Sequence, residues 1–161
     1  MNFKDIVQLL SSHFDEQAIL EIKEDVIQPY LAVEKSSLRD ICLFLKNNES
    51  LFFDYLACVT GIDNGPEAGT MEVIYHFNSI PFQHQFILKV VLPRSEPIIE
   101  TVSDIWKTAN WHERETYDLV GIKFKNHPDL RRILLTDDWQ GHPLRKDYKE
   151  QENYHGIVVK Y

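Results

Sequence analysis

The densest group of chemically capable side chains in this sequence is the run 112–118, HERETYD. If the run is helical, Glu115 and Asp118 are neighbours at i, i+3, and Arg114 and Asp118 are neighbours at i, i+4. Two adjacent carboxylates can perform general acid–base catalysis when one of them is desolvated and its pKa rises. The same pattern is also typical of a solvated helix face that carries ion pairs.

A third interpretation joins these carboxylates to basic residues further along the chain. Arginine is well suited to bidentate pairing with a carboxylate, so a charge network can hold the C-terminal segment against the rest of the protein. Within that segment, residues 142–144 are expected to form a turn with an apolar anchor. The predicted network consists of Glu113, Arg114, Glu115, Asp118, Arg131, Arg132, Arg145 and Lys146.

Other kinds of site have little support in the sequence. The seven histidines form no HExxH or HxxxH pair and no CxxC accompanies them, and His127 and His142 each precede a proline. Hydrogen bonding is therefore a better expectation for them than metal ligation. Glycine-rich phosphate loops and a GxSxG nucleophile motif are absent. Cys42 and Cys58 lie among apolar neighbours and are predicted to be buried thiols, too few to hold an iron–sulfur cluster. No cofactor or metal is expected on this chain.

Composition and charge indicate a globular protein of one domain. The chain has 161 residues, 43% hydrophobic and 26% charged, with a formal net charge of −8. Residues 1–100 carry 15 acidic and 7 basic side chains, whereas residues 123–149 carry 7 basic and 4 acidic ones. This asymmetry suits docking between proteins and is also within ordinary surface variation, but it does not suit nucleic acid.

Neither a membrane span nor a secretory signal is evident. No apolar run approaches the ~18–20 residues that a bilayer requires, and the stretch 6–10 is too short for a signal sequence. We therefore expect a soluble intracellular domain unless a partner holds it elsewhere.

Apolar periodicity places the regular elements. Helical spacing predicts helices over 2–14, 37–47, 98–109 and 111–120, the last ended by Gly121. Alternation or apolar β-branched runs predict strands within 18–33, 51–62, 71–77, 82–92 and 122–125. The fold class is α+β, a mostly antiparallel sheet with helices packed on it, followed by a long irregular C-terminal tail.

The tail differs in character from the rest of the chain. We divide the single domain into a body, residues 1–121, and an extended docking tail, residues 122–161. Beyond Asn126 the sequence is rich in turn residues but still holds Trp139, Leu144 and Tyr148, which is too apolar for a free linker. The tail is expected to lie on another surface.

The same region carries a family resemblance. The pattern ERExxDLV over 113–120, His127, and RxIL over 131–134 resembles the signature of the 30 kDa (C-type) subunit of proton-pumping NADH:quinone oxidoreductase, respiratory complex I. The stretch 137–148, DDWQGHPLRKDY, is similar to the GHPLRKD stretch of that family. The matching signature and interface residues are Glu113, Arg114, Glu115, Asp118, His127, Arg131, Arg132, Asp138, Gly141, His142, Pro143, Leu144, Arg145, Lys146 and Asp147.

The resemblance implies a non-catalytic subunit in the peripheral arm of the complex, on the cytoplasmic side of the cell (inner) membrane. It implies docking onto the D-type subunit, the cluster-free relative of the hydrogenase large subunit, next to other arm subunits. It also implies support for electron transfer from NADH to quinone coupled to proton translocation. NADH, FMN, iron–sulfur clusters and quinone would belong to the whole complex, with no cofactor on this chain.

Three alternatives remain open at this point. One is the equivalent subunit of a membrane-bound hydrogenase or a related dehydrogenase complex. Another, from a different class, is a stand-alone acid–base enzyme that uses Glu113 and Glu115 and has a pocket beside them. The third is a binding domain that merely shares the fold.

Overall fold

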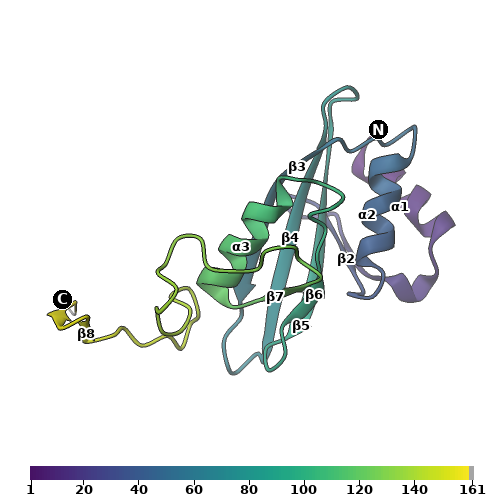
Figure 1. Cartoon of the computed structure of the whole chain (residues 1–161). Coiled ribbons are helices and arrows are strands. Elements are labelled where there is room, and N and C mark those ends of the chain that lie inside the picture. The colour runs from purple at the N-terminus through teal and green to yellow at the C-terminus, as the bar shows by residue number, and fades with distance from the viewer. Residues whose placement is uncertain (160–161) are drawn as a thin grey trace.

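The protein is a five-stranded sheet with helices on one face and a tail that leaves the body beyond α3 (Figure 1). The structure is a computed structural model and describes residues 1–159. Its helices are α1 (Phe3–His13), the 3₁₀ turn η1 (Glu16–Ala18), α2 (Leu38–Asn47) and α3 (Ala109–Val120). Its strands are β1 (Ile19–Lys23), β2 (Tyr30–Val33), β3 (Tyr55–Asp63), β4 (Thr70–Ser79), β5 (His84–Pro93), β6 (Ile98–Glu100), β7 (Lys123–Lys125), β8 (Asn153–Tyr154) and β9 (Ile157–Val158).

The main sheet has the strand order β1-β2-β5-β4-β3 and is antiparallel at every junction except β2 with β5. Residues of β4 alternate strictly between buried and half-buried, because successive side chains point to opposite faces. One face therefore belongs to the core and the other is left open. This confirms the α+β class with a mostly antiparallel sheet.

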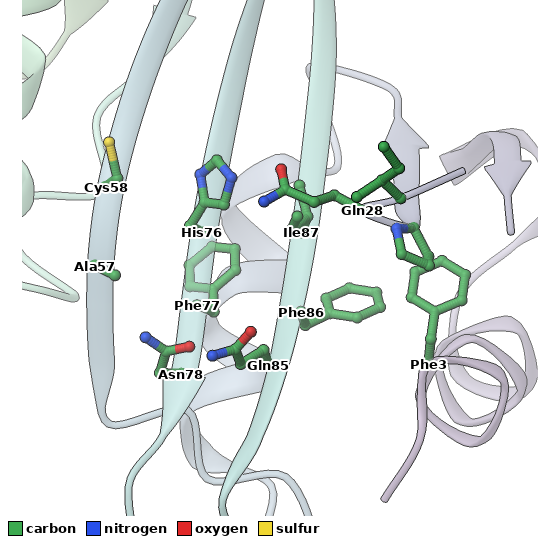
Figure 2. Close-up of a pocket in the computed structure, with 12 residues that line it drawn as sticks. Phe3, Gln28, Ala57, Cys58, His76, Phe77, Asn78, Gln85, Phe86 and Ile87 are labelled. Atoms are coloured by element: carbon green, nitrogen blue, oxygen red, sulfur yellow. The ribbon is translucent and has the colours of Figure 1, made fainter. Parts of the chain in front are cut away.

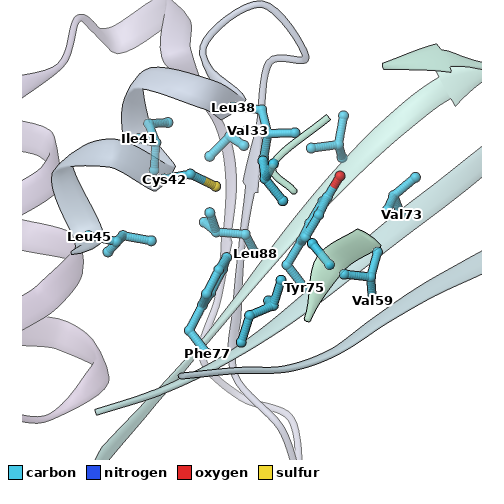
Figure 3. Packing of buried hydrophobic residues seen from close by; sticks show 14 of the residues in the cluster. Val33, Leu38, Ile41, Cys42, Leu45, Val59, Val73, Tyr75, Phe77 and Leu88 are labelled. Carbon is cyan, nitrogen blue, oxygen red and sulfur yellow. The ribbon is translucent and has the colours of Figure 1, made fainter. Parts of the chain in front are cut away.

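The core lies between the inner sheet face and the helices. Tyr75 and Leu88 from the sheet point toward Ile41 and Cys42 of α2, and all four side chains are fully buried (Figure 3). The apolar stripe of α1 joins the same cluster through Ile6 and its neighbours. Helices α1 and α2 thus form because each buries one apolar face against the sheet.

Helix α3 covers the edge of the sheet at β3. The Thr108 hydroxyl, just before α3, donates to the Leu56 carbonyl at 3.0 Å, and the Thr116 hydroxyl donates to the Val59 carbonyl at 3.5 Å. A Cβ on Gly61 would lie 2.5 Å from Thr116 Cγ2, so glycine permits this close approach. The β3 edge is shielded and α3 is fixed against the body.

The predicted helix over 98–109 is wrong. Residues 98–100 form β6, which pairs in parallel with β7, and turns lead from there to α3 at Ala109. The backbone N–H of Val102 donates to the carboxylate of Glu113 at 2.8 Å, which diverts the chain from helical hydrogen bonding. The helical spacing of apolar residues arises here because successive turns each return one side chain to the core.

Other local predictions are mostly confirmed. Helix α1 forms within the predicted range 2–14 and begins with a capping box of Asn2 and Asp5. Helix α3 ends at Gly121, as predicted, in the left-handed conformation with φ of 84°. Cys42 is buried as predicted, but Cys58 is only half-buried. The prediction for Cys58 is wrong because the bulge between Leu56 and Cys58 turns this side chain to the open face.

Beyond β7 the described part of the tail has little regular structure apart from the two short strands β8 and β9, and β8 lies far from the N-terminus (Figure 1). The last two residues of the predicted tail, 160 and 161, lie outside the described residues. None of the helices within residues 1–159 is both long and apolar enough to cross a lipid bilayer.

Candidate functional site

The tail returns across the C-terminal end of α3 and satisfies its free carbonyl groups. The last carbonyls of a helix have no partner within the helix, and here the tail supplies donors for them. The Gly121 N–H closes the helix by donating to the Tyr117 carbonyl at 2.9 Å. The next three carbonyls accept hydrogen bonds from the tail: Asp118 from His142 Nδ1 at 2.9 Å, Leu119 from the Leu144 N–H at 2.9 Å, and Val120 from Arg145 Nε at 2.8 Å.

Charge reinforces this arrangement. The C-terminal end of a helix carries a partial negative charge, which favours nearby cations. Arg145 reaches the Val120 carbonyl and also the Gly121 carbonyl at 3.5 Å, and Arg132 NH1 donates to the Asp118 carbonyl at 3.1 Å. The predicted tail residues His142 and Arg145 therefore cap the protein's own helix, and Arg145 pairs with carbonyls instead of the expected carboxylates.

Asp118 is the centre of the attachment. Its carboxylate is fully buried and accepts from Arg132 NH1 at 2.7 Å on one oxygen. The other oxygen accepts from three successive backbone N–H groups, those of Ile133, Leu134 and Leu135, at 3.0, 2.8 and 2.9 Å. Burial alone would raise the pKa of Asp118, but these hydrogen bonds outweigh it and hold the pKa below its usual value. The side chain thus stays ionised and fixes the path of the tail.

Two features of the structure require glycine at position 121. Its φ of 84° is the left-handed conformation that side chains disfavour. A Cβ there would also lie 2.5 Å from Cδ2 of His142 and 2.6 Å from NH2 of Arg145. The tail can approach the helix end only because this position has no side chain.

A second attachment joins the tail to the end of β3. Buried Asp63 accepts from Arg94 Nε at 2.7 Å and from the backbone N–H of Lys146 at 2.9 Å, and Arg94 also pairs with Asp147. The Arg94 guanidinium is the main cause that lowers the pKa of Asp63 well below its usual value. Sequence reasoning missed both Asp63 and Arg94. The only signal in the sequence is Asp63 at the start of the run 63–66, DNGP, whose residue types indicate a turn.

Glu113 accepts its hydrogen bonds from the segment before α3. Its carboxylate is fully buried and accepts from the Thr101 hydroxyl and the Val102 N–H, so it stabilises the turn before α3. Burial is the main cause that raises its pKa to about 7. His127 Nε2 lies 3.8 Å from the carboxylate, while its Nδ1 accepts from Asp129 N–H at 3.0 Å, which fits the neutral ring.

Three other predicted residues have different partners from those expected. Arg114 donates to the backbone carbonyls of Arg131 and Arg132 at 3.2 and 3.0 Å, which also holds the tail. The Arg131 side chain is exposed and pairs locally with Asp129 at 3.0 Å. Glu115 is exposed on the outer side of α3. The structure therefore brings Arg114, Asp118 and Arg132 together but not Glu115.

The far part of the tail folds on itself. Asp138 accepts from the Tyr154 hydroxyl at 2.8 Å and pairs with His155 at 2.7 Å, and the first of these contacts is the main cause that lowers the pKa of Asp138 to about 2. The Gly141 carbonyl accepts from Arg132 NH2 at 2.8 Å. Pro143 is half-buried, and Leu144 is 60% exposed. The apolar anchor predicted at 142–144 is therefore not buried within the described residues, because most of the Leu144 side chain is exposed.

The acid–base interpretation predicts a pocket beside Glu113 and Glu115. Neither residue lines any of five hollows that the described residues form, which range from about 180 to about 520 Å³. Figure 2 shows the largest of them on the open sheet face, where Cys58, His76, Asn78 and Gln85 offer no carboxylate. Among the described residues, no three His, Cys, Asp or Glu side chains are placed to hold a metal ion.

Beyond residue 130 the tail is held by hydrogen bonds and has no fully buried side chain among the described residues. From residue 131 to residue 159 no side chain is buried, whereas the body has a continuous core. Large apolar side chains are exposed instead, both here and on the adjoining face of α3: Leu134 (62%), Leu144 (60%), Ile157 (67%), Val158 (73%) and Trp111 (66%). Such a surface is typical of one that a partner covers.

Comparison with known proteins finds relatives that are subunits of oxidoreductase complexes. The chain is 45% identical over 146 residues to the C-type subunit of NADH-quinone oxidoreductase from Chloroherpeton thalassium. The aligned region covers 89% of this chain and 60% of that protein's length. It is 41% identical to the C-type subunit of F(420)H(2) dehydrogenase from Methanosarcina mazei over 92% of this chain and 93% of the relative. The solved trypsin-resistant fragment of Nqo5 superimposes with a TM-score of 0.66 and 26% identity, over 81% of this chain and 100% of the fragment.

The family model for the 30 kDa subunit of respiratory-chain NADH dehydrogenase matches residues 31–154, from β2 into the tail. That range includes Asp118, Arg132 and the helix-capping segment 142–145. This chain belongs to the 30 kDa subunit family of respiratory-chain NADH dehydrogenase.

Proposed function

We propose that this chain is a non-catalytic, scaffolding subunit in the peripheral arm of a respiratory NADH:quinone oxidoreductase, and that its tail docks onto a neighbouring subunit. The observation that carries the proposal is the tail itself, whose backbone is fixed on α3 while its large apolar side chains, such as Leu134 and Leu144, are exposed. A segment held rigidly before binding loses less conformational entropy when a partner covers it.

The D-type subunit is the partner that we propose for this surface, with other arm subunits nearby. The resemblance of residues 113–148 to the 30 kDa family supports this choice, since the same residues hold the tail in place. The solved Nqo5 fragment is also relevant, because a trypsin-resistant part of that relative matches most of this chain. This supports a division into a compact body and a tail that needs a partner.

A scaffolding role fits the side chains better than catalysis does. Both oxygens of the Glu113 carboxylate accept hydrogen bonds inside the protein, where a substrate has no access. Glu115 is exposed without a second carboxylate beside it, because Asp118 is enclosed by the tail. We therefore expect NADH, flavin, clusters and quinone to bind other subunits, and the isolated chain to have no oxidoreductase activity.

The proposed location is the cytoplasmic side of the cell membrane, reached through the complex. In this role the protein keeps the arm in the geometry through which electrons pass from NADH to quinone with coupled proton translocation. The Methanosarcina relative favours a second candidate, the same scaffold in a dehydrogenase complex with another electron donor. Both candidates share the docking tail.

The test is to replace Leu134 and Leu144 together with Asp in the native cells and purify the complex in mild detergent. We expect loss of co-purifying subunits and of membrane NADH:quinone activity, with the body still folded. The matched control is Ile80→Asp, at an equally exposed apolar position (65%) on the β4–β5 turn. Wild-type recovery of the partners with the double variant would refute the docking role.

A further inference from the structure

The sheet has a second edge, at β1, which is built differently from the β3 edge. Strand β1 is last in the strand order and pairs only with β2 among the described strands. Within residues 1–159 no helix covers it in the way that α3 covers β3, and four of its five residues, from Leu20 to Lys23, are exposed. The N-terminal elements lie across the sheet from the tail (Figure 1), so this edge faces a different direction.

Apolar side chains gather at this edge. Leu20 is 56% exposed and Ile22 is 45% exposed, and Ile27 in the following loop is fully exposed. Between α1 and β1 lies an open hollow of about 320 Å³ whose walls include Phe14 and Ile22. An unpaired strand edge beside exposed apolar groups is a template for another strand.

The charges around the edge are mostly negative. Residues 15–25 contain five carboxylates, Asp15, Glu16, Glu21, Glu24 and Asp25, and one cation, Lys23, which gives a net charge of −4. Lys4 pairs with Glu24 at 3.0 Å and reduces this only to −3. Glu16 is itself a wall of the hollow. A ligand of this edge must therefore combine apolar groups with positive charge.

We propose that the β1 edge binds an extended segment of a partner protein in which apolar residues alternate with Lys or Arg. The segment adds a strand beside Glu21–Lys23, inserts one apolar side chain into the hollow against Phe14, and places its cations beside the carboxylates. The alternation follows from strand geometry, since every second side chain points to the same face.

The charge also decides between possible occupants. A second copy of this chain would bring −3 against −3 across an edge-to-edge pair, with Lys4 counted, and these charges repel. An anionic lipid surface is disfavoured by the same carboxylates. A basic segment of another protein is the occupant that the charges favour. The chain would then join two partners, one at the tail and one at β1. This inference rests on the proposed function in one respect, that the second partner is sought within the same complex.

The experiment places a photo-crosslinking amino acid, p-benzoylphenylalanine, at Leu20 in the complex in native cells, and identifies cross-linked peptides by mass spectrometry. The same probe at Leu144 reports on the tail independently. We expect Leu20 to cross-link to a partner segment with an excess of Lys and Arg. A complex that cross-links at Leu144 but not at Leu20 overturns the β1 proposal alone, as does a cross-link from Leu20 to lipid, to a second copy or to a segment without excess cations.

Charge reversal provides the second measurement. The double variant Glu21→Lys, Asp25→Lys is expected to lower recovery of the cross-linked partner by about tenfold or more. The matched control is Glu49→Lys, Glu96→Lys, which makes the same change of charge at exposed positions away from the edge. An equal loss with both pairs, or no loss with the first, contradicts the proposal.

Discussion

Asp118 and Arg132 form a buried ion pair, with 2.7 Å between Oδ1 and NH1, at the point where the tail turns back over α3. Arg132 extends the contact by donating to the carbonyls of Trp139 and Gly141 at 2.9 and 2.8 Å. One arginine thus connects a helix to two separate points of an otherwise irregular segment. This is why a tail without a core of its own has a defined path.

Removing the Asp118 charge should destabilise the protein. In Asp118→Asn, Arg132 loses its ionic partner and three backbone N–H groups face a weaker acceptor, so we expect a loss of about 3–5 kcal/mol in the free energy of unfolding. Denaturant unfolding measures this. Asp129→Asn, which breaks the exposed Arg131 pair, should cost less than about 1 kcal/mol; equal costs would show that Asp118 has no special role.

Gly121→Ala should detach the tail as well as strain the backbone. The matched control is Gly69→Ala, which also has positive φ (65°) but no atom within 4 Å of the added Cβ. Both variants carry the cost of the left-handed conformation, and Gly121→Ala adds the clash with His142 and Arg145, roughly 1–3 kcal/mol more. Unfolding free energies and the rate of trypsin cleavage in the tail provide the comparison. Indistinguishable variants would mean that the close contact at Gly121 is unimportant.

Glu113 should make stability fall as pH rises. Because its pKa is raised to about 7 in the folded state from 4.5, its favourable contribution is complete below pH 4.5 and is lost through pH 7. This difference corresponds to about 3 kcal/mol at full ionisation. Glu113→Gln keeps the hydrogen-bonding shape without the charge.

The measurement for Glu113 is the free energy of unfolding from pH 5 to pH 8 in both proteins. We expect the variant to gain stability relative to wild type as pH rises. The lowered pKa of buried His127 acts in the opposite sense over the same range, so only the difference between the two proteins is diagnostic. Parallel curves would show that Glu113 does not titrate there.

Local signals in the sequence predicted much of the fold. The apolar stripe of α1, the alternation in β4 and the stop at Gly121 all depend on residues close together in the chain. The segment 98–109 failed because its path depends on Glu113, a side chain on a later helix. The spacing of apolar residues cannot distinguish a helix from a series of turns that a carboxylate distant in the sequence stabilises by hydrogen bonds.

The candidate site was predicted in part. Grouping opposite charges placed Asp118 and Arg132 in one predicted network, and in the structure they form an ion pair. The same grouping assigned carboxylate partners to Arg145, which binds helix carbonyls, and it omitted Asp63 with Arg94, which are 31 residues apart. Backbone acceptors and long-range ion pairs leave no periodic trace in a sequence, so the tertiary fold was needed to find them.

The most direct test of the central claim is the accessibility of Leu144 in the assembled complex. Leu144→Cys, in a Cys58→Ser background that removes the half-buried native thiol, is labelled with a maleimide in the isolated chain and in the purified complex. The account predicts rapid labelling of the isolated chain and at least about tenfold slower labelling in the complex, because a partner covers the tail. Equal rates in an intact complex would contradict it.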